Sequence, residues 1–261
     1  MALVHVNAIG NMMFEGALAN LNWVNPQLTA KMAIDNRPVA VGIKIQLTKA
    51  ITGANDMEGL KRALEAANIS RLPLMVHIED SYSPLPDLLN QLRRGDVYTH
   101  CFNNRTHGIL NAAGEIIPEA HAARARGVFF DIGQGQTHLS FDVAEKCMKQ
   151  DFLPDSISTD LTSITVERRV FDLPTMVSKF MAIGLPLEKA IGMVTVNPAR
   201  VFDYAAQIGS LKPGSEADVS IFELRDGKFD FEDSDGVVRT GRQRLFNKIV
   251  VRHGRVIVNE V

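Results

Sequence analysis

Cysteine is scarce in this chain of 261 residues, which contains only Cys101 and Cys147. Two cysteines are too few for a disulfide framework, so we expect a protein of the reducing cytoplasm. Long apolar runs are also missing. No stretch of 18 apolar residues occurs, which argues against a membrane span, and the first residues lack the basic and apolar segments of a signal peptide.

An excess of basic charge is absent as well. The formal net charge is −2, whereas a surface that binds nucleic acid is normally basic. Neither GxGxxG nor GxxxxGK[ST] occurs, so a nucleotide-binding fold is unsupported. The hydrophobic content of 46% and a length of 261 residues indicate a globular protein with a sizeable core. We therefore expect neither a nucleic acid nor a membrane as partner.

The stretch from residue 71 to residue 105 contains the most informative pattern. Two strand-like segments, 72–79 and 96–102, flank a helix-like segment at 85–94 that Gly95 closes. Each strand contains a histidine near its end, His77 and His100. Buried strands that end in a polar side chain are typical of the catalytic end of a parallel β/α barrel.

The rest of the chain repeats this unit at intervals of about 30 residues, the length of one strand and helix in a barrel. Alternation of strands and helices indicates a parallel sheet, in a barrel or an open α/β fold. Further strands are predicted at 4–9, 39–47, 128–132 and 156–161, and helices at 26–35, 57–67, 118–126, 141–149, 173–183 and 187–193, with another starting at Asn197-Pro198.

Beyond residue 205 the pattern changes to short β segments, 218–223, 245–252 and 255–258, the last two joined by His253-Gly254 as in a tight hairpin. This indicates a small antiparallel unit. We place the boundary near residue 206, with an α/β part at 1–205 and a β part at 206–261.

Several residues have a chemical and a structural interpretation. His77 and His100 are either core histidines or ligands of zinc or a similar ion. Lys44 interrupts the apolar run VGIKIQL, where an ammonium group needs a partner. It forms either a salt bridge or a carbamate with carbon dioxide, whose two oxygens bridge metal ions. Asp160 is either a helix cap or a metal-bound carboxylate that shuttles protons.

Two loops contain candidate substrate-binding residues. The first candidates are Asn103, Arg105 and His107, and Arg105 is suited to a substrate carboxylate. The second loop, which follows the strand at 128–132, offers Gln134, Gln136 and His138. For each of these side chains, an ordinary role on a solvated loop is the alternative.

The chain resembles the amidohydrolase superfamily, and most of all its deacetylase branch, which is related to dihydroorotases and to proteins called adenine deaminases. Lys44 in GIK, His77 in VHIED, His100 in THCFNN and Asp160 in STD match its pattern. The tail matches as well, with Thr195-Val196-Asn197-Pro198-Ala199 followed by IGSLKPG and by Ala217-Asp218.

The resemblance implies a TIM-like (β/α)8 barrel with a small β-sandwich part and one or two divalent ions, most simply zinc. Lys44 would be the carboxylated bridging ligand, and His77 and His100 would bind the second metal. Asp160 would bind the first metal, take a proton from the bridging water and deliver it to the leaving group. The implied activity is hydrolysis of an amide C–N bond or an acyl ester in a small-molecule substrate.

The sequence departs from the family in one respect, because no H-x-H pair occurs and His5 stands alone. If Lys44 lies on strand four, the chain covers about strands three to eight of such a barrel. An open barrel edge favours association, so we expect a homo-oligomer. Two alternatives to the hydrolase remain, a catalytically silent barrel fragment and a purine-type deaminase.

Overall fold

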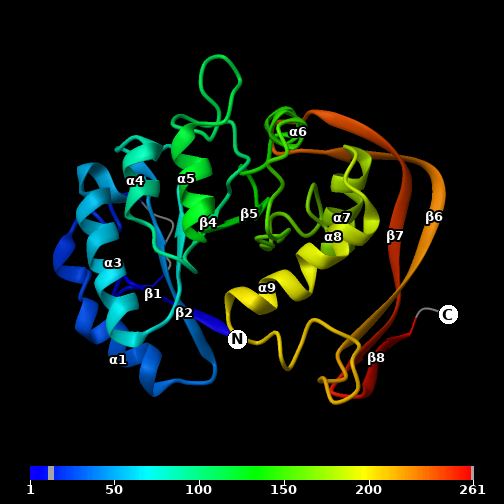
Figure 1. Ribbon diagram of the computed structural model, residues 1–261, viewed down its shortest axis with the longest axis horizontal. Coiled ribbons are helices and arrows are strands. Elements are labelled where there is room, and N and C mark those ends of the chain that lie inside the picture. The colour runs from blue at the N-terminus through cyan, green and yellow to red at the C-terminus, as the bar shows by residue number, and fades with distance from the viewer. Residues whose placement is uncertain (11–14, 260–261) are drawn as a thin grey trace. The chain divides into compact units, whose positions relative to one another are not determined.

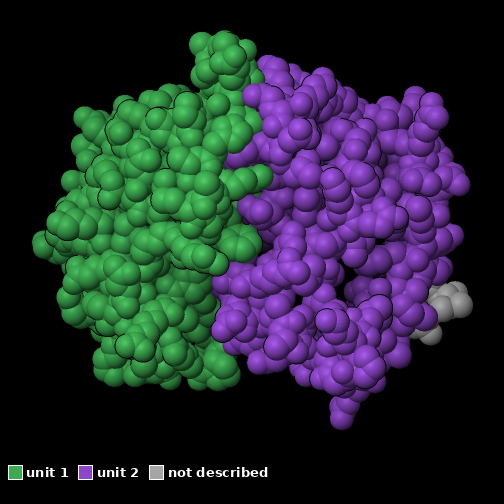
Figure 2. All heavy atoms as spheres, viewed as in Figure 1, with its two compact units in different colours: residues 1–130 green, residues 131–261 purple. Residues whose placement is uncertain are grey.

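The computed structural model describes residues 1–10 and 15–259. The chain divides into two compact units, residues 1–130 and 131–261 (Figure 2), and each is described by itself. Within the described residues, no helix is long and apolar enough to cross a membrane.

Strands and helices alternate over the first half of the chain, and two long strands and a short one form its C-terminal part (Figure 1). The elements are β1 (Ala2–His5), η1 (Leu21–Trp23), α1 (Pro26–Asp35), β2 (Ala40–Gln46), α2 (Lys49–Thr52), η2 (Gly53–Asn55), α3 (Asp56–Ser70), β3 (Leu74–His77), α4 (Leu85–Gln91), β4 (Val97–Thr99), α5 (Pro118–Arg126), β5 (Phe129–Asp131), α6 (Phe141–Lys149), α7 (Leu173–Ala182), α8 (Leu187–Val194), α9 (Val196–Val201), β6 (Val219–Glu232), β7 (Val238–Arg252) and β8 (Arg255–Asn259).

Five strands form one sheet in the order β1-β2-β3-β4-β5, so that neighbours in the sequence are neighbours in space. The pairs from β1 to β4 are parallel, and this order with helical crossovers is that of a β/α barrel. Helices α1 and α3 pack on the strands β1 to β3 (Figure 1). Strand β1 forms one edge of the described sheet, beside an apolar groove of about 600 Å³.

The two faces of β2 differ in character. Ile43 and Ile45 are fully buried, and a Cβ added to Gly59 of α3 would lie 3.4 Å from Ile45 Cδ1. Because successive side chains of a strand point to opposite faces, Lys44 and Gln46 face away from the helices. The predicted apolar strand is thus confirmed, and its one charged residue lies on the inner face.

Helix boundaries were predicted well where caps mark them. Asn25 accepts a hydrogen bond from the backbone N–H of Leu28 and starts α1, as Asn-Pro predicts. Helix α5 ends before Gly127, whose φ of 93° is the left-handed conformation that favours glycine.

The second unit contains the antiparallel sheet β6-β7-β8. The predicted hairpin at His253-Gly254 is confirmed between β7 and β8. Helix α7 packs on β7, where Ser178 Oγ accepts a hydrogen bond from the backbone N–H of Leu245 at 3.0 Å. Strands β6 and β7 are longer than predicted, because backbone pairing continues over residues 224–232 and 238–244 although many of their side chains are charged and exposed.

Several predicted boundaries were wrong. The first strand is β1 at Ala2–His5 and not at 4–9. The segment 156–161 forms only an isolated parallel bridge, from Ser156 to Asp131. Strand β4 ends at Thr99 instead of continuing to residue 102. Helix α9 begins at Val196, so that Pro198 is its third residue and not its first.

The predicted boundary near residue 206 falls within the second compact unit, between α9 and β6. It separates two kinds of secondary structure and does not coincide with the division after Phe130. As a domain boundary it stays a prediction.

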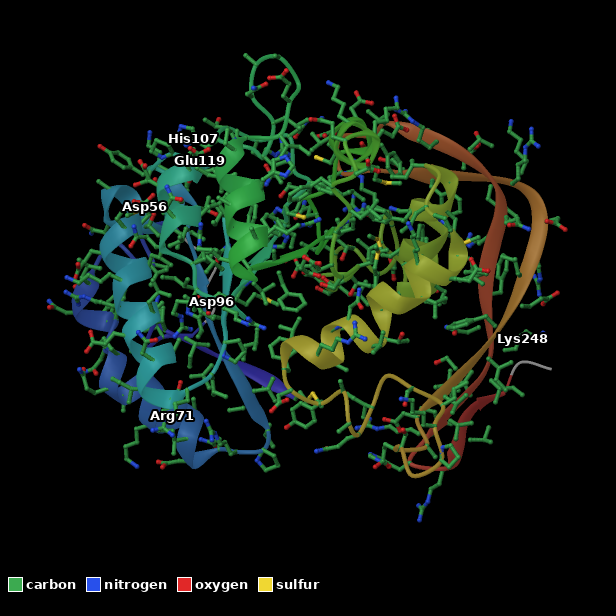
Figure 3. The ribbon with its side chains drawn as sticks, in the orientation of Figure 1. Asp56, Arg71, Asp96, His107, Glu119 and Lys248 are labelled. Carbon is green, nitrogen blue, oxygen red and sulfur yellow. The ribbon has the colours of Figure 1, made fainter. Side chains whose placement is uncertain are left out.

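The buried carboxylate of Asp96 joins two strands of the first unit (Figure 3). It is fully buried and accepts hydrogen bonds from the backbone N–H groups of Leu74 at 2.9 Å and Arg93 at 2.8 Å. It also accepts one from the Arg93 guanidinium at 2.7 Å. One side chain thus holds the start of β3 against the turn before β4.

We expect Asp96→Asn to lower the free energy of unfolding by about 3 kcal/mol, because an amide nitrogen would face backbone donors and the guanidinium would lose its charged partner. Asp87→Asn, at an exposed position of α4, removes the same charge and should cost less than about 0.5 kcal/mol. Urea unfolding measures both. Equal losses in the two variants would contradict this role of Asp96.

Candidate metal centre

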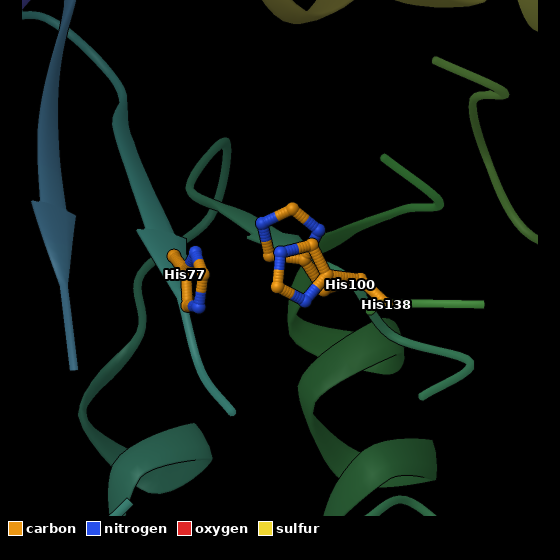
Figure 4. A group of neighbouring side chains, drawn as sticks. All are labelled: His77, His100 and His138. Carbon is orange, nitrogen blue, oxygen red and sulfur yellow. The ribbon is translucent and has the colours of Figure 1, made fainter. Parts of the chain in front are cut away.

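Two buried imidazoles lie side by side in the first unit. His77 is the last residue of β3 and His100 directly follows β4, and the two residues are 5% and 3% exposed. The ring centroids are 4.2 Å apart and the ring planes cross at 72° (Figure 4). The structure therefore brings together the two histidines that the sequence singled out.

The position of His100 depends on a break in the strand geometry. Thr99 pairs with His77 in the parallel register, so strict alternation would place residue 100 on the opposite face. His100 has a φ of 67°, a left-handed conformation that is uncommon outside glycine and ends the strand. This local turn accounts for the contact of its ring with His77.

Polar neighbours surround the ring of His77. Its Nε2 atom lies 3.3 Å from Thr48 Oγ1 and 3.5 Å from Glu79 Oε2. The other carboxylate oxygen of Glu79 lies 3.4 Å from Arg105 Nε. Glu79 was not among the predicted site residues, although its spacing of two residues from His77 places it at the same strand end. A carboxylate beside one ring nitrogen is the usual way to orient a metal-binding imidazole.

Lys44 lies on the same face of the sheet as His77. It pairs in register with His5 of β1 and Met75 of β3, and Gln46, two residues along β2, pairs with His77. Burial, with a smaller contribution from the charge of Lys44, lowers the pKa of His5 to about 4. At neutral pH the His5 imidazole is therefore uncharged.

The predicted substrate loop is held together by its own side chains. Asn103 is 2% exposed and donates to the backbone carbonyl of His100 at 2.8 Å, while its carbonyl oxygen accepts from the backbone N–H of Arg105 at 2.9 Å. His107 is exposed, with a φ of 59°. Asn103 thus shapes the loop after His100, and substrate binding by these three residues stays a prediction.

Asp160 and His138 form a second pair, within the second unit. Asp160 Oδ2 lies 3.8 Å from His138 Nε2, with side chains 48% and 6% exposed. Backbone N–H groups of Ile132, Gln134 and Gly135 donate to the carbonyls of 156, 158 and 159. These parallel backbone hydrogen bonds position Asp160 beside His138, although residues 156–159 do not form a regular strand. Metal binding by Asp160 stays a prediction.

Because Gly135 has no side chain, Asp160 and His138 can both lie close to its backbone. Its φ is 48°, and an added Cβ would lie 2.4 Å from Asp160 Oδ2 and 2.9 Å from His138 Cδ2. Asp131, in contrast, accepts hydrogen bonds from Ser156 Oγ at 2.6 Å and Ser158 Oγ at 2.8 Å.

The turn between β6 and β7 holds the loop that contains His138. Asp233 is fully buried and accepts from the backbone N–H of Phe141 at 2.9 Å, at the start of α6. Ser234 exchanges hydrogen bonds with the backbone of Leu139, donating from its N–H and accepting at Oγ. The residues directly after His138 are thus tied to the C-terminal sheet.

A buried lysine lies beneath the same turn. Lys179 Nζ donates to Gln134 Oε1 at 2.7 Å and to the carbonyl of Glu232 at 2.6 Å. Burial lowers the pKa of Lys179 to about 7, against the opposing effect of the Asp233 and Glu232 carboxylates. Sequence analysis missed this residue, because a lysine in a helix is ordinarily exposed.

The residues of the first unit fit a divalent metal ion. Two imidazoles at neighbouring strand ends, one of them oriented by a carboxylate, provide nitrogen ligands of the kind that zinc prefers. The same face of the sheet contains Lys44. A protonated amine has no lone pair for a metal ion, so participation of Lys44 requires loss of its proton or conversion to a carbamate.

Comparison with known proteins finds a matching family model and similar curated proteins. The model of the amidohydrolase family matches residues 27–244. A deacetylase from Enterococcus faecalis is 33% identical over 246 residues, which cover 93% of this chain and 66% of that protein. A deacetylase from Agrobacterium fabrum is 34% identical over 212 residues, 81% of this chain and 52% of that protein. The chain thus spans about half to two thirds of the length of these curated relatives.

Solved structures are similar over nearly the whole chain. A crystal structure of an adenine deaminase has a TM-score of 0.94 at 32% identity and covers 98% of this chain and 70% of that one. A dihydroorotase has a TM-score of 0.89 at 28% identity, with 99% and 68% covered. These similarities confirm the predicted fold class, a TIM-like α/β architecture with a separate antiparallel sheet.

We expect Gly135→Ala to displace Asp160 and His138 and to lower the free energy of unfolding by about 2 kcal/mol, since the new methyl group overlaps both side chains. Gly184→Ala is the control, because Gly184 also has a positive φ but no atom lies within 4 Å of an added Cβ. It should cost about 1 kcal/mol. Chemical denaturation and a crystal structure of the variant check both effects. An unmoved Asp160 in Gly135→Ala would contradict the close approach.

The buried Lys179 predicts a pH dependence of stability. Its pKa is about 7 in the folded chain and has an ordinary value of 10.5, so the unfolded chain binds more protons between these values and stability rises with pH. We therefore expect the stability of the wild type relative to Lys179→Met to increase from about pH 7 to about pH 9.5. Urea unfolding at both pH values measures this difference. A difference that does not change with pH would show that Lys179 stays protonated.

Proposed function

Because the chain belongs to the amidohydrolase family, we propose that it hydrolyses an amide C–N bond or an acyl ester in a small molecule, with the help of a divalent metal ion. The observation that supports this most is the buried pair His77 and His100, with ring centroids 4.2 Å apart. The curated relatives are named deacetylases, so we propose an N-acyl or O-acyl compound as substrate.

We propose that His77 and His100 hold the ion, zinc being the simplest choice, and that Lys44 joins them as a carbamate. When bound, such an ion would supply a water molecule acidic enough to lose a proton near pH 7. Glu79 and Thr48 orient the His77 ring through Nε2. Cys101 and Cys147 are both buried, and we include a cytoplasmic location in this proposal.

Asp160 is the proposed proton carrier of the second unit. It accepts a proton from the attacking water and delivers it to the leaving amine or alcohol. The neighbouring His138 has its Nε2 atom 3.8 Å from Asp160 Oδ2, which is beyond hydrogen-bond distance but close enough for an electrostatic interaction with the carboxylate. We propose that Arg105 meets a substrate carboxylate, since a guanidinium fork binds this group in a bidentate manner, and that its contact with Glu79 sets its direction.

We expect the purified full chain to bind zinc and to hydrolyse members of a panel of N-acetylated and O-acetylated amino and hydroxy acids. His77→Ala should reduce bound zinc and turnover by about tenfold or more, because one nitrogen ligand is lost. His121→Ala is the matched control, since it removes an exposed histidine of α5, and it should leave both quantities unchanged. Elemental analysis and product detection by mass spectrometry measure them.

The panel also includes adenine. Release of ammonia from adenine, with acyl compounds untouched, would replace the proposed function by deamination. Absence of bound zinc together with absence of any turnover would leave only the catalytically silent fragment. Equal zinc content in His77→Ala and the wild type would contradict the metal centre even if hydrolysis occurs.

A further inference from the structure

His5 is the direct neighbour of Lys44 in the sheet. Strands β1 and β2 are parallel, and His5 pairs with Lys44 in their register. Paired residues of adjacent strands, about 4.8 Å apart, place their side chains on the same face. The imidazole and the lysine chain therefore lie side by side on the inner face of the sheet.

The hydrogen bonds of His5 assign its proton. Nδ1 accepts from the backbone N–H of Asn7 at 3.1 Å, so in the neutral ring the proton is on Nε2. The Nε2 atom is buried and has no hydrogen-bond partner among the residues that the structure describes. Buried donors without an acceptor are rare in folded proteins, and each calls for an explanation.

We propose that His5 is a positioning residue for a carboxylated Lys44, to which its Nε2–H donates a hydrogen bond. This inference rests on the proposed function, which includes the carbamate. It identifies His5 as the hydrogen-bond donor that holds the carbamate of Lys44 in place.

Carboxylation of Lys44 creates an oxygen that can accept a hydrogen bond from the Nε2–H of His5. The protonated amine of Lys44 first loses one proton to solvent. Its nitrogen lone pair then attacks the carbon of carbon dioxide, an N–C bond forms, one C=O π bond breaks, and its electrons remain on oxygen. Loss of the second N–H proton leaves the anion –NH–CO2⁻, so that one lysine and one carbon dioxide yield a carbamate and two protons.

Carboxylation changes the electrostatic relation between the two side chains. An ammonium group beside the Nε2–H of His5 places a donor against a donor, whereas a carbamate oxygen offers a charged acceptor. Hydrogen bonds to charged acceptors are the stronger kind. On the other side of Lys44 the paired residue is Met75, whose thioether has no N–H or O–H to donate.

The test measures carboxylation directly and without turnover. The full chain is incubated with zinc and increasing concentrations of ¹³C-labelled bicarbonate, and the carbamate carbon is followed by NMR. His5→Leu removes the donor, and His5→Gln retains an N–H at a similar distance from the backbone. Met75→Leu is the control, because it changes packing on the other side of Lys44 without removing a donor.

We expect His5→Leu to raise the bicarbonate concentration for half-carboxylation about tenfold, as the loss of a hydrogen bond to a charged group predicts. His5→Gln and Met75→Leu should stay within about twofold of the wild type. Should His5→Leu not fold, ¹⁵N-histidine NMR of the wild type is the second readout. There the His5 Nε2–H signal should move downfield on carboxylation.

The test distinguishes failure of the proposed role of His5 from failure of the carbamate itself. If the wild type and His5→Leu carboxylate Lys44 equally well, the role of His5 is overturned and the proposed function stays intact. The same holds if the wild type carboxylates Lys44 and its His5 Nε2–H signal does not move. A wild type that forms no carbamate at any bicarbonate concentration overturns both the role of His5 and the carbamate in the proposed function.

Discussion

Parallel pairing of β1 to β4 is the constraint on which the candidate centre depends. Each strand joins the next in a register that places alternate residues on the same face. The helix-side face is filled by side chains such as Ile43 and Ile45, and this packing prevents a shift of β2 by one residue, because such a shift would expose them. The same register places Lys44 beside Met75 and Gln46 beside His77.

The contact between the two imidazoles depends on how β4 ends, because regular strand pairing alone does not bring them together. His100 meets His77 because its backbone leaves the strand geometry at a positive φ. Asn103 then closes the following loop by bonding back to the His100 carbonyl. Strained backbone of this kind persists only where surrounding contacts hold it in place. The buried hydrogen bonds of Asn103 are such contacts, so the loop and the imidazole pair form one structural unit.

In the second unit, polar groups of the C-terminal sheet support the residues near Asp160. Asp233 and Ser234 bind the backbone directly after His138, and Lys179 binds Gln134 at the beginning of the same loop. These groups are buried, so each lost partner would leave an uncompensated charge or donor. The antiparallel sheet therefore has a second role besides its own stability, since it determines the course of a loop that contains a candidate site residue.

The sequence by itself determined the α/β class, most helix boundaries and the identity of His77 and His100, because periodicity, Asn-Pro caps and strand ends are local signals. It also singled out Lys44, because a charge within an apolar run is visible without coordinates. The tertiary structure alone decided that Glu79 and Thr48 contact His77, that Asn103 braces a loop, that Lys179 is buried and that His5 stands beside Lys44. The contacts of Thr48, the burial of Lys179 and the place of His5 depend on register and on residues distant in the chain, and no local pattern encodes them.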